Sequence, residues 1–147
     1  MQIPNNELRI GNWVLINNQY IHMDLKMFHA VLMRFEGYVP EPIPLTPEIL
    51  EKCGFEKKVF TETHDAGYYT KGYTDSRVYY FRELGTGNTS LAFCDGQYDK
   101  CSLIQLKTPV DDGVYKFLHF AYHPKYLHEL QNLYFGLTGK ELPINLK

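Results

Sequence analysis

The feature that most constrains this chain is a succession of short β-prone segments between residues 56 and 122. The segments are 57–64, 68–73, 77–84, 89–94, 101–106 and 115–122. Clusters of turn residues separate them, among them Asp65-Ala66-Gly67, Thr74-Asp75-Ser76 and Gly85-Thr86-Gly87-Asn88. Connections this short join antiparallel neighbours, so the pattern predicts a five- or six-stranded antiparallel meander.

Two helices are predicted around this meander. Thr46-Pro47-Glu48 combines an N-cap, a proline in the first turn and an acidic residue at the helix start, and Gly54 supplies the end of a short helix. Residues 125–137 form a longer amphipathic helix that Gly139 ends. Its apolar stripe consists of Tyr126, Leu127, Leu130, Leu133, Tyr134 and Leu137.

The first 44 residues predict a hairpin, a segment with two possible conformations and an extended connector. Residues 8–23 contain two β-prone stretches around Asn17-Asn18, typical of a hairpin or of the first strand of a small barrel. Residues 24–35 fit a strand or a short helix, and the spacing of Leu25, Phe28, Leu32 and Phe35 favours the helix. Prolines at alternate positions in 38–44 predict an extended connector. The expected fold is therefore α+β: an antiparallel β meander or small barrel with a short central helix and a C-terminal amphipathic helix, in a single domain of residues 1–147.

Charge and hydropathy exclude several classes of protein. The chain has 147 residues and a formal charge of −2, and its basic residues gather in no single stretch, which disfavours generic nucleic-acid binding. Apolar runs are far shorter than the ~20 residues that span a bilayer, so we expect no membrane partner. Nothing at the N-terminus resembles an export signal, and we expect a cytoplasmic protein.

Metal and catalytic sites are not indicated. His119, His123 and His128 could be combined with Cys94 and Cys101, but none of these residues forms the close pairs typical of structural zinc. Cys53 falls on the apolar side of the short helix, which favours inert burial over a nucleophilic role. Paired aspartates such as Asp95 with Asp99, or Asp111 with Asp112, lie beside glycines, where turns favour aspartate. We therefore expect no catalytic residues, no metal and no cofactor, and a non-enzymatic role is favoured.

Aromatic residues make up 15% of the chain, including 12 tyrosines. The densest group alternates with basic residues in 68–82, and from it we select Tyr69, Tyr73, Arg77 and Arg82 as ligand-binding candidates. Tyrosine can stack on a base and arginine can hold a phosphate. The alternative is a solvated β-ribbon whose tyrosines pack across strands. Side chains alternate between faces, so Arg82 falls opposite Arg77 unless a bulge intervenes.

Three blocks of sequence resemble a known family. Residues 128–142, HELQNLYFGLTGKEL, are similar to the signature HQLQNLYFALTGEEL of uncharacterised small proteins carried by phages and prophages of gut-type bacteria. Residues 8–14 and 43–57 extend the resemblance in the same order. Glu129 replaces the usual glutamine and Lys140 the usual glutamate. The resemblance implies a phage accessory protein and carries no known activity.

Two functions follow as hypotheses. The first is a counter-defence protein that binds and sequesters a small nucleotide-like ligand. The second is a module that inhibits or bridges a host protein through an aromatic surface. The sequence leaves open whether the chain forms homo-oligomers.

Overall fold

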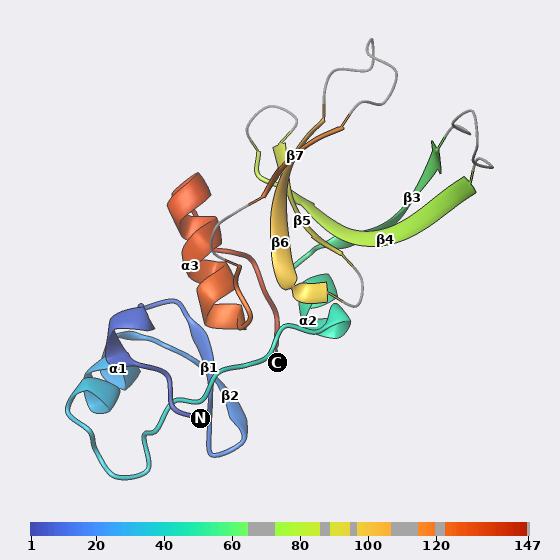
Figure 1. The fold of residues 1–147 in the computed structure, drawn as a ribbon. Coiled ribbons are helices and arrows are strands. Elements are labelled where there is room, and N and C mark those ends of the chain that lie inside the picture. Colours follow the sequence, from blue (N-terminus) through green and yellow to red (C-terminus); the bar gives the residue numbers. More distant parts are fainter. Residues whose placement is uncertain (65–72, 86–88, 95–96, 107–114, 120–122, 147) are drawn as a thin grey trace.

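The computed structural model describes residues 1–64, 73–85, 89–94, 97–106, 115–119 and 123–146. The chain has an N-terminal lobe, a five-stranded sheet and a C-terminal helix between them (Figure 1). It is an α+β fold, as the sequence predicts. Within the described ranges, no helix has the length and apolar character needed to cross a bilayer.

The N-terminal lobe contains the predicted hairpin. Strands β1 (Trp13–Ile16) and β2 (Gln19–His22) pair antiparallel, and both residues of the connecting turn, Asn17 and Asn18, have positive φ. Positive φ at both turn residues matches the twist of a two-residue hairpin, and asparagine tolerates it well. A 3₁₀ turn, η1 (Asn5–Glu7), precedes the hairpin. This lobe has its own small core, built on Ile3, Leu8, Val14, Ile16, Met23 and Val31.

Helix α1 (Leu25–Leu32) confirms the helical interpretation of residues 24–35. Asp24 caps it, because its carboxylate accepts a hydrogen bond from the Met27 amide at 2.8 Å. The buried side of the helix is not the stripe that the spacing suggested: Ala30 and Val31 are buried, whereas Leu25 and Leu32 are exposed. An eight-residue helix on a small lobe cannot bury all of its apolar residues.

Helix α2 (Pro47–Lys52) begins as predicted, with the Thr46 hydroxyl accepting from the Ile49 amide at 3.3 Å. Gly54 ends it at a φ of 73°. The extended segment before α2 forms isolated bridges, Glu41 with Leu15 and Pro44 with Tyr126, so the connector links the hairpin to the start of α3.

The five-stranded sheet is an antiparallel meander in the order β3-β4-β5-β6-β7. Its strands are β3 (Glu56–His64), β4 (Tyr73–Glu83), β5 (Thr89–Cys94), β6 (Gln97–Leu106) and β7 (Tyr115–His119). Among the described strands, β3 and β7 are the two edges, so the sheet is open rather than a closed barrel.

One predicted turn is wrong. Thr74, Asp75 and Ser76 lie inside β4, opposite residues 61–63 of β3, rather than between two strands. These three residues include neither glycine nor proline, so their turn signal is weak. A continuous nine-residue ladder with β3 satisfies their backbone groups instead. The predicted Asp65-Ala66-Gly67 turn and segment 68–72 lie outside the described residues.

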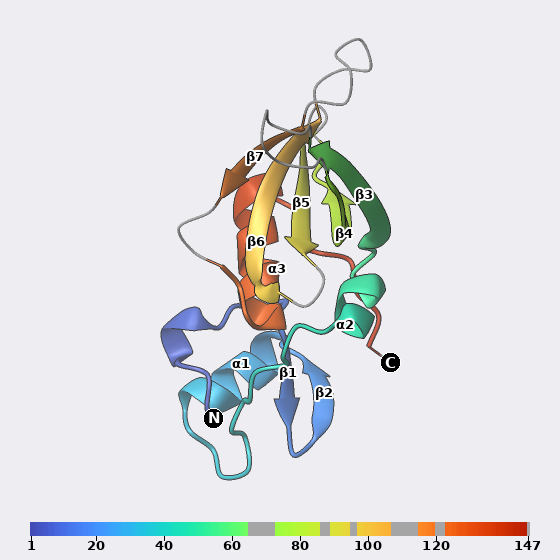
Figure 2. The ribbon, with the colours of Figure 1, turned by 45° about the vertical axis from the view of Figure 1, so that its right-hand side comes forward.

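Helix α3 (Leu127–Thr138) packs beside the sheet and above the N-terminal lobe (Figure 2). Leu127, Leu130 and Tyr134 belong to the main core, together with Leu91 and Phe93 of β5. The prediction that Leu137 continues this apolar stripe is wrong, since Leu137 is exposed in the last turn of the helix. Gly139 ends the helix with a left-handed φ of 68°, as predicted.

Candidate functional site

The predicted ligand-binding residues do not form a described cluster. Tyr69 lies outside the described residues, and Tyr73 and Arg77 are placed as backbone positions of β4, opposite His64 and Phe60 of β3. Because β4 is continuous, positions 73 and 77 share one face and position 82 belongs to the other, as the alternation predicted. The ligand role of these residues stays a prediction.

Arg82 has structural partners. One of its terminal nitrogens donates to the Cys53 carbonyl at 2.5 Å, at the end of α2. Its guanidinium lies over the Tyr134 ring of α3, 5.5 Å from the centroid. A Cβ atom at position 54 would collide with this guanidinium. The absence of a side chain at Gly54 therefore leaves room for Arg82 beside the end of α2. Arg82 thus ties β4 to both helices.

Cys53 is buried, as expected. Burial raises the pKa of its thiol to about 12, which outweighs the opposing effect of the Arg82 charge. The thiolate needed for nucleophilic attack is therefore scarce at neutral pH.

An apolar surface on the N-terminal lobe is a candidate interaction site. We call it the α1 surface, and it consists of Leu25, Leu32, Met33, Phe35, Tyr38 and Val39, all exposed. Leu25 and Leu32 are seven positions apart and lie on one side of α1. The centroids of the His29 and Phe35 rings lie 6.3 Å apart, and the two rings are nearly perpendicular. This contact packs the helix against the loop that follows it.

The loop after α1 is held by its backbone. Arg34 adopts a left-handed φ of 53°, and the Phe35 amide donates back to the Ala30 carbonyl at 3.1 Å. This is the helix-ending arrangement in which glycine usually takes the left-handed position. The Tyr38 amide donates to the Phe35 carbonyl at 3.1 Å. The exposed aromatic rings are therefore presented by a hydrogen-bonded loop.

A groove adjoins the loop part of this surface. Its volume is about 690 Å³, within the usual range of ligand and side-chain pockets. The N-terminal segment 2–5 forms one wall, and Phe35, Tyr38 and Val39 contribute apolar lining. In residues 24–39, Asp24 and Glu36 balance Lys26 and Arg34. The charges of these four residues therefore cancel, and the α1 surface is dominated by apolar side chains.

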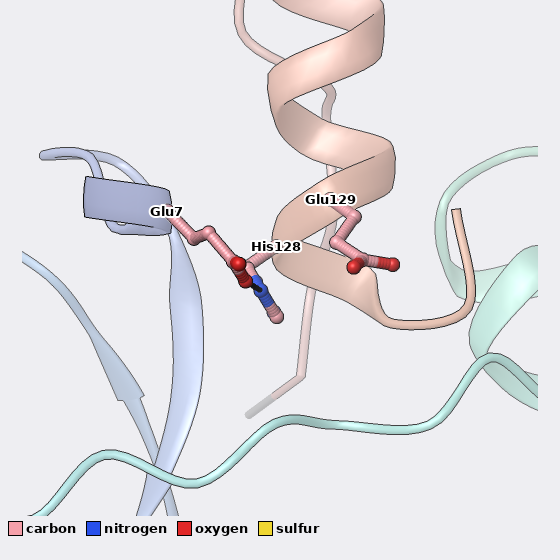
Figure 3. Close-up of side chains that lie close together, drawn as sticks. All are labelled: Glu7, His128 and Glu129. Carbon is pink, nitrogen blue, oxygen red and sulfur yellow. Dashed lines mark ion pairs between the residues drawn. The ribbon is translucent and has the colours of Figure 1, made fainter. Parts of the chain in front are cut away.

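A second cluster lies where η1 meets the first turn of α3 (Figure 3). We call it the His128 cluster, and it consists of Glu7, His128 and Glu129. His128 is buried, and its Nε2 lies 3.7 Å from a Glu7 carboxylate oxygen. Burial lowers the pKa of the His128 imidazole, and the neighbouring carboxylates oppose this effect without cancelling it. His128 is therefore neutral at pH 7.

Neither the α1 surface nor the His128 cluster is predicted by a local sequence pattern. Glu7 and His128 are far apart in the chain, and nothing in the local pattern of η1 pairs them. His128 was considered with His119 and Cys101, whose side chains lie outside the described part of the chain. The α1 surface left a weak signal: residues 24–39 hold more large apolar side chains than one short helix can bury.

Comparisons of the chain with protein-family models, with curated proteins and with solved structures gave no match.

Proposed function

We propose that this protein acts by binding a protein of its bacterial host through the α1 surface. The observation that carries the proposal is the concentration of six large exposed apolar side chains next to a groove. Contiguous exposed apolar surface is typical of protein interaction sites. This is the second of the two functions that the sequence suggested.

The composition of the surface favours a protein partner over a polyanion or a nucleotide. Phe35, Tyr38 and Met33 are residue types enriched at protein interfaces. The balanced charges of residues 24–39 offer no focus for phosphate. The resemblance to phage- and prophage-borne proteins supports a partner from the host, whose apolar side chains would enter the groove.

The test begins with site-specific photo-crosslinking in host cells. A crosslinking amino acid is placed at position 35 and, as a matched control, at position 59, because Val59 is equally apolar and exposed but lies on β3. A protein captured from position 35 and not from position 59 is purified, and calorimetry measures its affinity for the whole chain.

The decisive variant combines Met33→Glu with Phe35→Glu. Both side chains are more than half exposed, so folding should be unaffected. We expect the affinity to fall at least about tenfold, since two apolar anchors are lost, while Val59→Glu leaves it unchanged. Equal binding by wild type and the double variant would refute the proposal. A dimer of the wild type that the double variant dissolves would make the α1 surface a contact between copies of this chain.

Sequestration of a small nucleotide-like ligand stays a separate prediction. Calorimetry with cyclic and linear nucleotides tests it, and Arg77→Ala is the informative variant. Arg82 is unsuitable for this purpose, because its guanidinium is bonded to the Cys53 carbonyl and its loss would disturb the fold.

A further inference from the structure

The His128 cluster brings three metal-ligating side chains together from two segments. One ligand atom from each of Glu7, His128 and Glu129 can be chosen so that all three lie within 4.8 Å of one another. Glu7 comes from η1, whereas His128 and Glu129 begin α3 (Figure 3). Two carboxylates and one imidazole are a donor set for a divalent cation.

The state of His128 provides an independent observation. The residue is 1% exposed, and both Nδ1 and Nε2 are buried without a hydrogen-bond partner among the residues that the structure describes. The separation of 3.7 Å from Glu7 is too long for a hydrogen bond. Buried polar atoms are nearly always satisfied, so an imidazole with two orphaned nitrogens needs a partner that the described part of the chain does not supply.

The spacing suits a bound ion. Ligand atoms at about 2.0–2.2 Å from a tetrahedral zinc ion lie roughly 3.3–3.6 Å apart. The 3.7 Å between His128 Nε2 and Glu7 Oε2 is close to this value, although no hydrogen bond forms there. A cation between the two atoms would satisfy the imidazole nitrogen and neutralise the carboxylates at once.

Neighbouring groups hold the cluster in place. Glu129 Oε2 accepts hydrogen bonds from the backbone amides of Lys125 at 2.6 Å and Tyr126 at 3.1 Å, which fixes the carboxylate at the start of α3 and leaves Oε1 for an ion. The Tyr126 ring stacks on the His128 ring at 6.0 Å. Asn132 donates to the Glu7 carbonyl at 2.8 Å and so fixes η1 against the helix.

We propose that Glu7, His128 and Glu129 form a binding site for a divalent transition-metal ion, with zinc as the ion that fits best. Ca²⁺ and Mg²⁺ prefer all-oxygen ligand sets, and an imidazole nitrogen favours zinc and its neighbours in the first transition series. The three protein ligands leave a fourth position for water. Glu7 is half-exposed and provides the route by which the ion enters.

Calorimetric titration of the whole chain with Zn²⁺, after treatment with a chelator and dialysis, tests the site. We expect saturable binding of one ion per chain and a higher melting temperature with Zn²⁺ than with chelator. The central variant is Glu7→Gln, whose side chain is half-exposed and whose backbone carbonyl still accepts from Asn132. Its affinity for Zn²⁺ should fall at least about tenfold, with no change of melting temperature in chelator.

Glu51→Gln is the matched control, since Glu51 is an exposed glutamate on α2 outside the cluster. It should bind Zn²⁺ as the wild type does. The ring-nitrogen signals of His128 should shift in NMR spectra when Zn²⁺ is added. Wild-type affinity in Glu7→Gln, or a Zn²⁺ complex in which the His128 signals stay unchanged, would place the ion at another histidine and overturn the proposal. Absence of saturable binding at millimolar Zn²⁺ would overturn it as well.

Discussion

Helix α3 makes two contacts of opposite chemistry. Toward the sheet it presents Leu127, Leu130 and Tyr134, which are buried in the main apolar core. Toward the N-terminal lobe it presents Gln131 and Asn132, which bond to the hairpin segment. The stability of the apolar contact depends on the buried apolar area and has no preferred direction. The stability of the polar contact depends on the alignment of hydrogen-bond donors and acceptors.

The polar contact is a connected network. Gln131 accepts from the Trp13 amide at 2.8 Å and donates to the Gly11 carbonyl at 3.0 Å. Asn132 accepts from the Asn12 side chain at 3.0 Å and from Arg9 Nε at 3.1 Å. Asn12 and Gln131 are both buried. Such a network fixes one relative position of lobe and helix, because a shifted arrangement would leave buried groups unpaired.

Three segments far apart in the sequence, residues 8–14, 43–57 and 128–142, meet at these contacts. Residues 8–14 supply the hairpin side of the network, and residues 128–142 supply the helix side. The connector block joins them, since the Leu127 amide donates to the Ile43 carbonyl at 2.8 Å. We call the hydrogen bonds of Gln131 and Asn132 with residues 9–13 the polar joint.

The largest effect is expected on the apolar side of α3. Leu130→Ala removes a fully buried side chain and leaves a cavity, so unfolding in denaturant should show a loss of about 2–5 kcal/mol. Leu137→Ala is the control on the same helix, because Leu137 is exposed and its truncation should cost less than about 0.5 kcal/mol. A similar loss of unfolding free energy in the two variants would contradict the assignment of Leu130 to the buried face and Leu137 to the exposed face of α3.

A smaller effect is expected for Gln131→Leu on the polar side. The two side chains have similar volume, so the change removes hydrogen bonds without opening a large cavity. The Trp13 amide and the Gly11 carbonyl lose their partner, and we expect a loss of about 1–3 kcal/mol in the free energy of unfolding. A stability equal to that of the wild type would mean that the polar face contributes no more than an apolar one.

A double-mutant cycle measures the pairing across the joint. Asn12→Ala and Asn132→Ala, singly and together, should show a coupling energy of about 0.5–1.5 kcal/mol, since their side chains are bonded at 3.0 Å. Asn12→Ala combined with Val59→Ala on β3 should be additive. An additive Asn12–Asn132 pair would mean that the joint is a set of independent contacts.

The difference between the two faces also explains what the sequence could predict. The apolar stripe of α3 repeats at helical spacing, and this periodicity predicted the burial of Leu127, Leu130 and Tyr134. The same is true of the capped start of α2 and of the Asn17-Asn18 hairpin, whose signals are local. The alternation of β-prone segments and turn residues predicted the meander. The exception is Thr74-Asp75-Ser76, which was predicted as a turn but pairs with β3 inside β4.

The polar joint and the His128 cluster left no comparable signal. A glutamine or histidine on a helix is usually solvated, and its burial is decided by a partner more than 100 residues away in the chain. Arg82 shows the same principle, since the carbonyl and ring that hold it belong to α2 and α3. Local patterns predict elements, whereas long-range polar pairing appears only when the elements are assembled.

The smallest effect concerns the outer edge of the polar face, where Arg9 forms a two-pronged ion pair with Glu141 at 2.5 and 3.0 Å. The hydrogen bond that Glu141 accepts from Arg9 lowers the pKa of the Glu141 carboxyl group below the usual 4.5. A carboxylate with a lowered folded-state pKa contributes stability above its unfolded pKa and loses it as the pH falls through the folded value. The pair is half-exposed, so the contribution should stay below about 1 kcal/mol.

Glu141→Gln isolates this contribution, because Glu48 also has a lowered pKa and adds its own acid dependence to both proteins. The difference in unfolding free energy between wild type and Glu141→Gln should be constant from pH 6 to 7 and should shrink below about pH 4.5, as the wild-type carboxyl becomes protonated. At pH 7, added salt should shrink it too, since an exposed pair is screened. A difference that persists at pH 2 would show that Glu141 acts through packing and not through its charge. The Glu141 carboxyl group packs closely on Gly11: a Cβ atom added at Gly11 would lie 3.1 Å from it.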